Sequence, residues 1–482
     1  MLEDLIKERK KKLKELRDQG INPYPIFSQR TASIKEALDS FSAWSKSRKK
    51  IYLVGRIRSL RDQGKIVFLD LEDMSEKIQV VFKKEETQNF SFFKKYLDIG
   101  DFLEVYGYLF KTQRGEKSIL ALRLKILAKS LRPLPSDFYG LVDTETRLRK
   151  RYLDLILNKE TKELFIKKSK FWKAVREFLD KEGFLEVETP VFEMIPGGAE
   201  AEPFVTHHNA LDQDFYLRIS LEIALKKLIV GGFEKIYEIG RVFRNEGIDA
   251  EHLQDYTQME FYWAYADYRQ LMTFLKKMYR FVIKKTFGTL VFKWQGKKID
   301  WGKEWKVYDY CKLFFKENKI DPKTASLEEL LKKAQSLQIE VPQGAGKGRL
   351  IDLIYKKTVR PKLIQPCFLI NPPVEIEPLA KRSEKDPRVV ERLQVMAYGT
   401  ELGKGFSELN DPQDQRERFE EQMRLRAAGD KEAQMLDEDF LEALEYGMPP
   451  TAGFGMSERL FAVLANKPIR ETVFFPPMKK KS

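Results

Sequence analysis

The sequence contains very little cysteine and histidine, with two Cys and three His among 482 residues. Cys311 and Cys367 are too few for a disulfide framework or a structural zinc site, which favours a reducing compartment. The sequence also lacks any run of about eighteen apolar residues, and its N-terminal segment has no apolar core of the kind found in signal peptides. We therefore expect a cytoplasmic protein that does not insert into a membrane.

Basic residues, in contrast, are abundant: Lys and Arg number 87 against 73 Asp and Glu, for a formal net charge of +14. An excess of this kind in an enzyme is typical of one that meets a polyanion, although the charge does not say which polyanion. A chain of 482 residues is long enough for two or three domains, each with a hydrophobic core of its own.

The first part of the chain predicts a short helix followed by a small β domain. Residues 1–50 begin with good helix formers at positions 2–19, and Gly20 ends that pattern. Residues 51–130 contain five short alternating runs separated by Gly, Asp and charged turns. Five such strands favour an OB-fold barrel, which binds oligonucleotides on an exposed strand face, over another small β domain.

The rest of the chain has a mixed pattern of helices and strands. Residues 131–145 contain two prolines and a glycine and predict a linker. A second domain, 146–482, begins with a long amphipathic helical pattern at 146–182, and the run GFLEVETPVF then predicts a strand that ends at Pro190. The charged, Lys-rich segment 271–361 is mostly helical in pattern, and we interpret it as a helical insertion.

The most informative segment is GRVFRNEGIDAEHLQDYTQMEFYWAYADY, residues 240–268. A strand's period of two directs Met259, Phe261 and Trp263 to one face and Gln258, Glu260 and Tyr262 to the other. The preceding run IYEIGRVFR predicts a second strand, which would make a long-looped hairpin with Arg244 at its mouth. We predict a pocket for a charged metabolite, while a solvated rim charge or an ion pair is the alternative for any single residue.

Three further patterns add charged groups. Period two in LGKGFSEL puts Lys404, Phe406 and Glu408 on one strand face. Glu222 falls in the first turn of a predicted helix, where the helix dipole alone would favour a carboxylate. TAGFGMSERLFAVLAN predicts a Gly-rich turn that enters a helix carrying Arg459.

Residues 240–268 resemble the second signature motif of class II aminoacyl-tRNA synthetases, and GFLEVETPVF and TAGFGMSERLFAVLAN resemble the first and third motifs. Residues 195–220, IPGGAEAEPFVTHHNALDQDFYLRIS, and 403–422, GKGFSELNDPQDQRERFEEQ, are similar to lysyl-tRNA synthetases of class II. Strings this long are far more specific than a short motif. The resemblance covers nearly the whole chain and implies an anticodon-binding OB-fold, an α+β catalytic domain on an antiparallel sheet, and a homodimer that contacts through the first motif.

The resemblance also implies an activity: a lysine–tRNA ligase would join lysine and ATP into lysyl-adenylate with Mg²⁺ and pass the lysyl group to tRNA(Lys). A paralogue that binds tRNA with weakened catalysis, or one with shifted specificity, is the alternative. The implied catalytic residues are Arg244, which bridges the substrate carboxylate and the α-phosphate, Arg459, which holds the γ-phosphate, and Glu401, which binds the metal. The other implied ATP contacts are Glu246, His252 and Tyr256.

The implied lysine site consists of Gly198, Glu222, Arg244, Glu260, Tyr262, Lys404, Phe406 and Glu408. In the family, Glu408 and Tyr262 would lie nearest the side-chain ammonium, Phe406 would line the stem, and Glu222 would face the amino group. In the barrel, Phe68 would stack on an anticodon base, and Gln79 and Glu116 would hydrogen-bond to bases. For Phe68, a place in the barrel core is the alternative.

Four features depart from the family pattern. The earlier of two metal-binding glutamates is Gln394, whose neutral oxygen predicts weaker binding of one Mg²⁺ than a carboxylate would give. Lys404 and Leu253 stand where asparagines are expected, and Leu253 cannot hydrogen-bond to ATP. The third motif is one residue shorter than usual, which leaves the register of Arg459 open.

Overall fold

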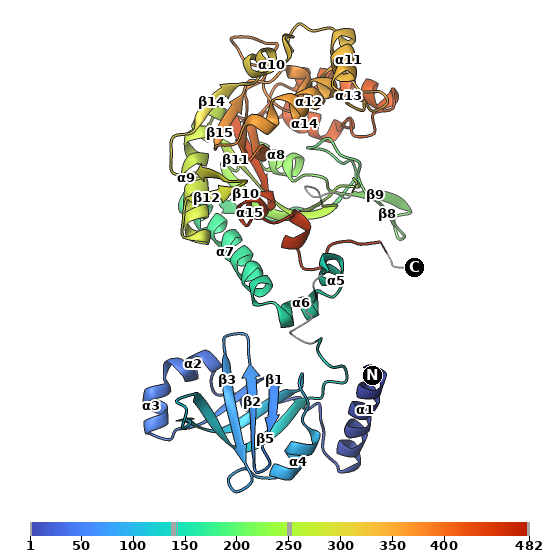
Figure 1. Cartoon of the computed structure of the whole chain (residues 1–482). Coiled ribbons are helices and arrows are strands. Elements are labelled where there is room, and N and C mark those ends of the chain that lie inside the picture. The colour runs from blue at the N-terminus through green and yellow to red at the C-terminus, as the bar shows by residue number, and fades with distance from the viewer. Residues whose placement is uncertain (1, 136–140, 142, 248–252, 480–482) are drawn as a thin grey trace. The chain divides into compact units, whose positions relative to one another are not determined.

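The computed structural model describes residues 2–135, 141, 143–247 and 253–479 (Figure 1). The chain divides into two compact units, Met1–Val142 and Asp143–Ser482, called unit 1 and unit 2 below. No helix among the described residues is long and apolar enough to cross a membrane.

Unit 1 is built on a closed five-stranded barrel, which confirms the predicted OB-fold. The strands are β1 (Lys50–Asp62), β2 (Ile66–Glu72), β3 (Lys77–Lys83), β4 (Phe102–Lys111) and β5 (Lys117–Ala128), closed in the order β1-β2-β3-β5-β4. Alternation along each strand sends apolar side chains inward, as with Val67, Leu69 and Leu71 of β2, which are all fully buried. The residues between them face outward.

Four helices accompany the barrel. They are α1 (Leu2–Asp18), α2 (Ile34–Asp39), α3 (Phe41–Lys46) and α4 (Phe90–Tyr96). The N-terminal helix, predicted at positions 2–19, is fixed to the barrel by Arg9, whose guanidinium donates to the carbonyl oxygens of Ile99 at 3.0 Å and Ser130 at 3.2 Å. Because Arg9 is nearly buried, these bonds satisfy donors that would otherwise be costly.

Unit 2 is built on an eight-stranded sheet in the order β14-β15-β16-β17-β18-β11-β10-β6. The strands are β6 (Leu185–Glu186), β10 (Lys235–Phe243), β11 (Asp255–Ala264), β14 (Lys306–Asp309), β15 (Cys367–Ile370), β16 (Arg392–Ala397), β17 (Thr400–Ser407) and β18 (Thr451–Ser457). Neighbours run antiparallel except at the two ends, where β14–β15 and β10–β6 are parallel. The expected α+β domain on a mainly antiparallel sheet is confirmed.

The two faces of this sheet have different coverings. The long helices α7 (Lys159–Lys181) and α9 (Tyr268–Phe287) share one hydrophobic core with inward side chains such as Phe261 of β11 and Phe454 of β18. A second core joins α8 (Glu222–Val230), α13 (Pro412–Ala427) and α14 (Glu438–Glu445) to Tyr262 and Phe406 of the sheet. The polar residues of the candidate site lie on this second face.

Two predicted elements differ from the structure near the start of unit 2. The stretch 146–182 is three helices, α5 (Thr144–Arg149), α6 (Arg151–Leu157) and α7, instead of one. The strand expected to end at Pro190 is reduced to the two residues of β6. The chain continues into a separate three-stranded sheet of β7 (Phe192–Glu193), β9 (Gln213–Leu217) and β8 (Val205–His208).

The segment 271–361 is not the simple helical insertion that its composition indicated. Its first residues belong to α9, which is part of the main core, and β14 is a strand of the main sheet. Between them lies the hairpin β12 (Val291–Trp294) and β13 (Lys297–Asp300). Helices follow as expected: α10 (Tyr310–Asn318), α11 (Leu327–Ser336), which Ser326 caps through the backbone N–H of Glu329, and α12 (Lys347–Thr358).

Candidate active site

A pocket of about 720 Å³ opens on the second face of the sheet in unit 2. Its walls come from the hairpin β10–β11, from β16, β17 and β18, from the start of α8 and from α12. The site residues predicted in unit 2 and described by the structure all line it: Gly198, Glu222, Arg244, Glu246, Tyr256, Glu260, Tyr262, Gln394, Glu401, Lys404, Phe406, Glu408 and Arg459. The predicted ATP contact His252 lies outside the described residues.

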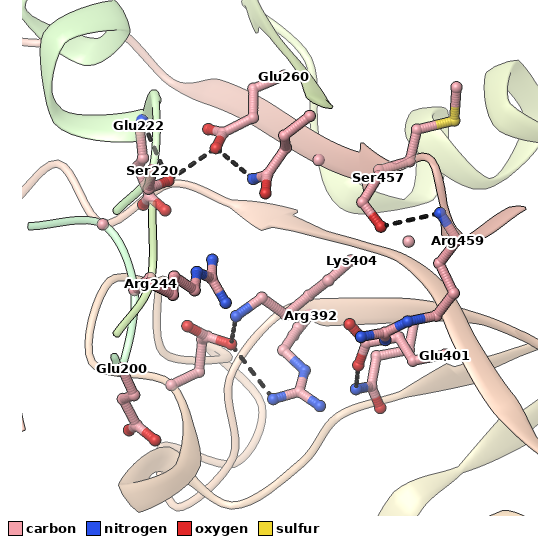
Figure 2. A pocket seen from close by; sticks show the side chains of 18 of the residues that line it. Glu200, Ser220, Glu222, Arg244, Glu260, Arg392, Glu401, Lys404, Ser457 and Arg459 are labelled. Atoms are coloured by element: carbon pink, nitrogen blue, oxygen red, sulfur yellow. Dashed lines mark hydrogen bonds and ion pairs between the residues drawn. The ribbon is translucent and has the colours of Figure 1, made fainter. Parts of the chain in front are cut away.

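Glu260 is held by several donors at the centre of one wall (Figure 2). Its Oε1 accepts from the Ser220 hydroxyl at 2.7 Å, the Leu221 backbone N–H at 3.0 Å and the Gln258 amide at 2.6 Å. Its Oε2 accepts from the Tyr262 hydroxyl at 3.0 Å. Both oxygens of the Glu260 carboxylate are therefore hydrogen-bonded to protein groups. These bonds fix the orientation of Tyr262 and the start of α8, and Glu260 also adds a negative charge to the pocket.

Two other carboxylates share an internal ammonium that the sequence patterns did not single out. Lys226 lies one turn after Glu222 on α8, and its Nζ is 2.6 Å from Glu222 Oε1 and 2.5 Å from Glu408 Oε2. Burial raises the pKa of Glu222 to about 7 and that of Glu408 well above its usual range, although Lys226 opposes both shifts. Burial would lower the pKa of Lys226, but the two carboxylates outweigh it and raise that pKa.

Glycines make the space in which these carboxylates lie. A Cβ atom at Gly453 would be 2.1 Å from Glu408 Oε1 and 2.5 Å from Tyr262 Cε1, so no larger residue fits on β18 there. Gly198 has φ +83, and a Cβ there would be 2.8 Å from that of Glu222. The glycines therefore belong to the construction of the pocket as much as the charged residues do.

Lys404 of β17 forms an ion pair with Glu377, a carboxylate that was not predicted to belong to the site. Its Nζ is 2.8 Å from Glu377 Oε2, and Arg392 reaches the same oxygen at 3.3 Å. Burial would raise the pKa of Glu377, but these two cations outweigh it and lower that pKa. The Lys404 side chain stays 37% exposed, so its ammonium remains accessible from the pocket.

Gln394 and Glu401, the predicted metal ligands, contact each other. The Gln394 side-chain amide donates to Glu401 Oε2, and Gln394 Oε1 is buried without a hydrogen-bond partner among the described residues. An orphaned amide oxygen beside a carboxylate is a donor set that a hard cation such as Mg²⁺ accepts. The described residues contain no group of three or more His, Cys, Asp or Glu side chains that could hold a metal, so any ion here would depend on oxygens from its substrate or from water.

Arg244 and Arg459 appear on opposite sides of the pocket in Figure 2. Arg244 follows β10; its Nε donates to the Ile219 carbonyl at 3.1 Å, and its guanidinium lies 5.7 Å from the ring centroid of Tyr256. Arg459 is the first residue of α15 (Arg459–Leu464), and its backbone N–H donates to the Ser457 hydroxyl at 3.2 Å. The predicted Gly-rich turn before Arg459 is instead strand β18, paired with β11 and β17.

The predicted anticodon-binding residues lie in unit 1. Phe68 is on the outer side of β2, only partly buried and opposite Arg61 of β1, so the alternative that placed it in the barrel core is wrong. Gln79 of β3 accepts a hydrogen bond from the Ser118 hydroxyl at 3.0 Å. Glu116 is exposed in the turn between β4 and β5.

Sequence reasoning missed Lys226, Glu377 and Arg392, which all take part in buried ion pairs. One signal for Lys226 was available, because a Glu and a Lys four residues apart on an apolar helix share a face. No local pattern connects Glu377, which follows η2 (Val374–Ile376), to Lys404 on a distant strand.

The chain is similar to known proteins along its whole length. Residues 143–479 match the family model described as "tRNA synthetases class II (D, K and N)", and residues 51–127 match an OB-fold nucleic acid binding domain. A lysine–tRNA ligase of Carboxydothermus hydrogenoformans is 45% identical over 487 residues, covering 100% of this chain and 99% of that protein. One from Moorella thermoacetica is 45% identical, over 99% of this chain and 98% of its own. One from Bacillus subtilis is 41% identical, over 100% and 98%.

Proposed function

The chain belongs to the class II tRNA synthetases, and we propose that it is a lysine–tRNA ligase, which activates lysine with ATP and transfers the lysyl group to tRNA(Lys). The full-length similarity to lysine–tRNA ligases supports this function. The observation that carries the specificity is the acidic end of the pocket, where Glu222, Glu260 and Glu408 lie buried around Tyr262. A substrate with ammonium groups would be stabilised there, while a neutral side chain would leave buried charge unpaired.

The first chemical step needs the lysine carboxylate to attack the ATP α-phosphate, so two anions must be brought together. Arg244 lines the same pocket as the acidic end and as Lys404 and Arg392, and its planar guanidinium can bind a carboxylate and a phosphate together. Arg459 would neutralise the far end of the triphosphate, and Tyr256 would lie against the adenine. Fixed charges of this kind lower the barrier by holding the reactants in line and stabilising the charge that develops.

Mg²⁺ would be held by Glu401 and by the orphaned oxygen of Gln394. When bound, the ion would supply positive charge to the phosphate oxygens. The same pocket contains the ion pairs that Lys404 and Arg392 make with Glu377. The exposed ammonium of Lys404 would be available to an anionic group of lysine or ATP.

Unit 1 would bind the anticodon through Phe68, Gln79 and Glu116, which belong to an OB-fold. We also propose a cytoplasmic homodimer. Exposed apolar side chains of the segment around β7 and β8 support the dimer: Phe192, Met194 and Val205 are each more than half exposed. Such a patch is typical of a surface that another chain covers.

The experiment that tests the function is ATP–pyrophosphate exchange with each of the twenty amino acids, followed by charging of tRNA(Lys). We expect exchange that depends on lysine and exceeds that with arginine or ornithine. Equal exchange with those amines would contradict the specificity. A weakened, tRNA-binding paralogue is the second candidate, favoured by Gln394 and Lys404, and it predicts tRNA binding with no lysine-dependent exchange.

A further inference from the structure

Lys226 is completely buried, and its ammonium is the same chemical group as the side-chain end of the proposed substrate, lysine. Its side chain is 0% exposed, and its Nζ lies 5.4 Å from the ring centroid of Phe406 and 5.9 Å from that of Phe440. A lysine in such surroundings needs charge partners, which it finds in Glu222 and Glu408. Lys226 thus connects helix α8 to the end of β17, which carry two of the three carboxylates at the acidic end of the pocket.

Each of these carboxylates keeps an oxygen for another partner. Lys226 is bound to Oε1 of Glu222 and lies beside Oε2 of Glu408. Oε1 of Glu408 is buried without a hydrogen-bond partner among the residues that the structure describes, and it lies against Gly453, whose missing side chain leaves room for it. Because Glu408 lines the pocket, an unpartnered oxygen of its carboxylate is a site for a positively charged donor.

The charges of the acidic end fit one class of substrate. Three carboxylates, Glu222, Glu260 and Glu408, and one ammonium, Lys226, give a net charge of minus two when all are ionised. Lysine presents two ammonium groups and directs its carboxylate elsewhere, so the bound complex would be neutral at this end. Without Lys226, three like charges would lie together, and protonation of one carboxyl would be favoured over their ionisation.

We propose that Lys226 is a positioning and specificity-determining residue, whose ammonium favours the ionised forms of Glu222 and Glu408 and aims both carboxylates so that the pocket prefers an amino acid with two ammonium groups. This inference rests on the proposed function and names how that site selects its substrate. The charged or titratable groups around the cluster are Glu222 on the same helix, Glu260 and Tyr262 on β11, Glu408 after β17 and Glu377 after η2.

The test compares Lys226→Met and Lys226→Gln with the parent enzyme across pH 6–9, using lysine and its neutral isostere norleucine. Gln retains hydrogen bonding and removes only the charge. We expect the preference for lysine over norleucine, measured as kcat/KM in ATP–pyrophosphate exchange, to fall by roughly 30-fold or more in both variants. The lysine KM should then decrease as pH rises, because the carboxyls must lose protons to bind an ammonium, and this decrease should be steeper than in the parent.

Lys227→Met is the matched control, since Lys227 is the next residue of α8 and pairs with Asp439 at the surface. It should keep the parent preference and pH profile. Calorimetry of lysine binding, with proton release measured in buffers of different ionisation enthalpy, gives a second readout. We expect Lys226→Met to release more protons per lysine than the parent at pH 8.

Parent-like preference and pH profile in either folded variant would overturn the proposal. If neither variant folds, Lys226→Arg decides, because the proposal requires it to keep the preference for lysine, and a native melting temperature with the preference lost would overturn it. Absence of lysine-dependent exchange in the parent would instead contradict the proposed function itself, so the two failures are distinguishable.

Discussion

Replacing Phe68 by alanine should weaken tRNA charging while leaving the barrel folded. Phe68 lies on the outer side of β2, between the inward residues Val67 and Leu69, and is only partly buried. Full burial of a Phe side chain contributes about 1.5 to 3 kcal/mol, so one that is mostly buried but still partly exposed contributes roughly 1 to 2 kcal/mol to stability. Stacking on one base contributes about 1 to 3 kcal/mol, which corresponds to roughly a 5- to 150-fold change in an equilibrium constant.

The assay measures two activities and one stability on the same protein. Charging of tRNA(Lys) should show a kcat/KM for tRNA lowered by that 5- to 150-fold range, whereas ATP–pyrophosphate exchange should be unchanged, because the pocket proposed to form the adenylate is lined by residues of unit 2. Phe82→Ala is the matched control, since Phe82 of β3 is fully buried in the barrel core. Its truncation should cost about 3 to 5 kcal/mol of stability.

Two results would refute this reasoning. If Phe68→Ala charges tRNA normally at a temperature where the barrel is folded, Phe68 does not stack on the anticodon. If Phe68→Ala lowers the melting temperature of the barrel as much as Phe82→Ala does, its contribution is to the packing of the barrel. Because Phe68 is partly exposed on the outer side of β2, we expect it to be accessible to a base and to contribute less to packing than Phe82.

Four other predictions follow from the site. Gln394→Glu should lower the Mg²⁺ concentration needed for half-maximal adenylate formation, because a carboxylate binds hard cations better than an amide; an unchanged Mg²⁺ dependence would show that this position is not a ligand. Glu408→Gln should weaken lysine binding by about 2 to 4 kcal/mol, and an unchanged lysine KM would place Glu408 outside the substrate's reach. Because burial raises the pKa of Glu222 to about 7, its protonated form prevails below that pH, so lysine affinity should rise as pH increases through 7; a flat profile measured by calorimetry contradicts this. A fragment beginning at Asp143, where unit 2 starts, should make lysyl-adenylate and charge tRNA poorly, and equal loss of both activities would refute the division of labour.

The barrel could be predicted from the sequence because each of its strands carries its own alternating pattern. The strand β18 could not, since Gly453 and Gly455 have low strand propensity and resemble a turn. Their role depends on contacts from elsewhere: a side chain at Gly453 would collide with Glu408 and Tyr262. Tertiary packing therefore decided the conformation of a segment whose local signal favoured a loop.

The candidate site could be predicted in part, because strand alternation groups some of its residues on one face. Glu260 and Tyr262 share a strand face, and Lys404 and Glu408 share another, so period two was enough to group them. The partners that hold them come from distant segments: Ser220 for Glu260, Glu377 for Lys404, and Lys226 for Glu408. A single sequence contains no periodicity that connects such positions.

Two of the four departures from the family pattern are adjacent in the fold. Gln394 of β16 and Lys404 of β17 are directly opposite partners in the ladder, although ten positions separate them in the sequence. Residues opposite each other in an antiparallel pair have Cβ atoms about 4.5 to 5.5 Å apart, so the charge of one affects what the other can bind. An amide at 394 leaves the ammonium of Lys404 to pair with Glu377, whereas a carboxylate at 394 would compete with Glu377 for it. The effect of Gln394→Glu on Mg²⁺ binding should therefore be larger when Lys404 is also replaced by Asn, because the new carboxylate then has no neighbouring ammonium to pair with. An Mg²⁺ dependence that is identical in the single and double variants would show that the two positions act independently.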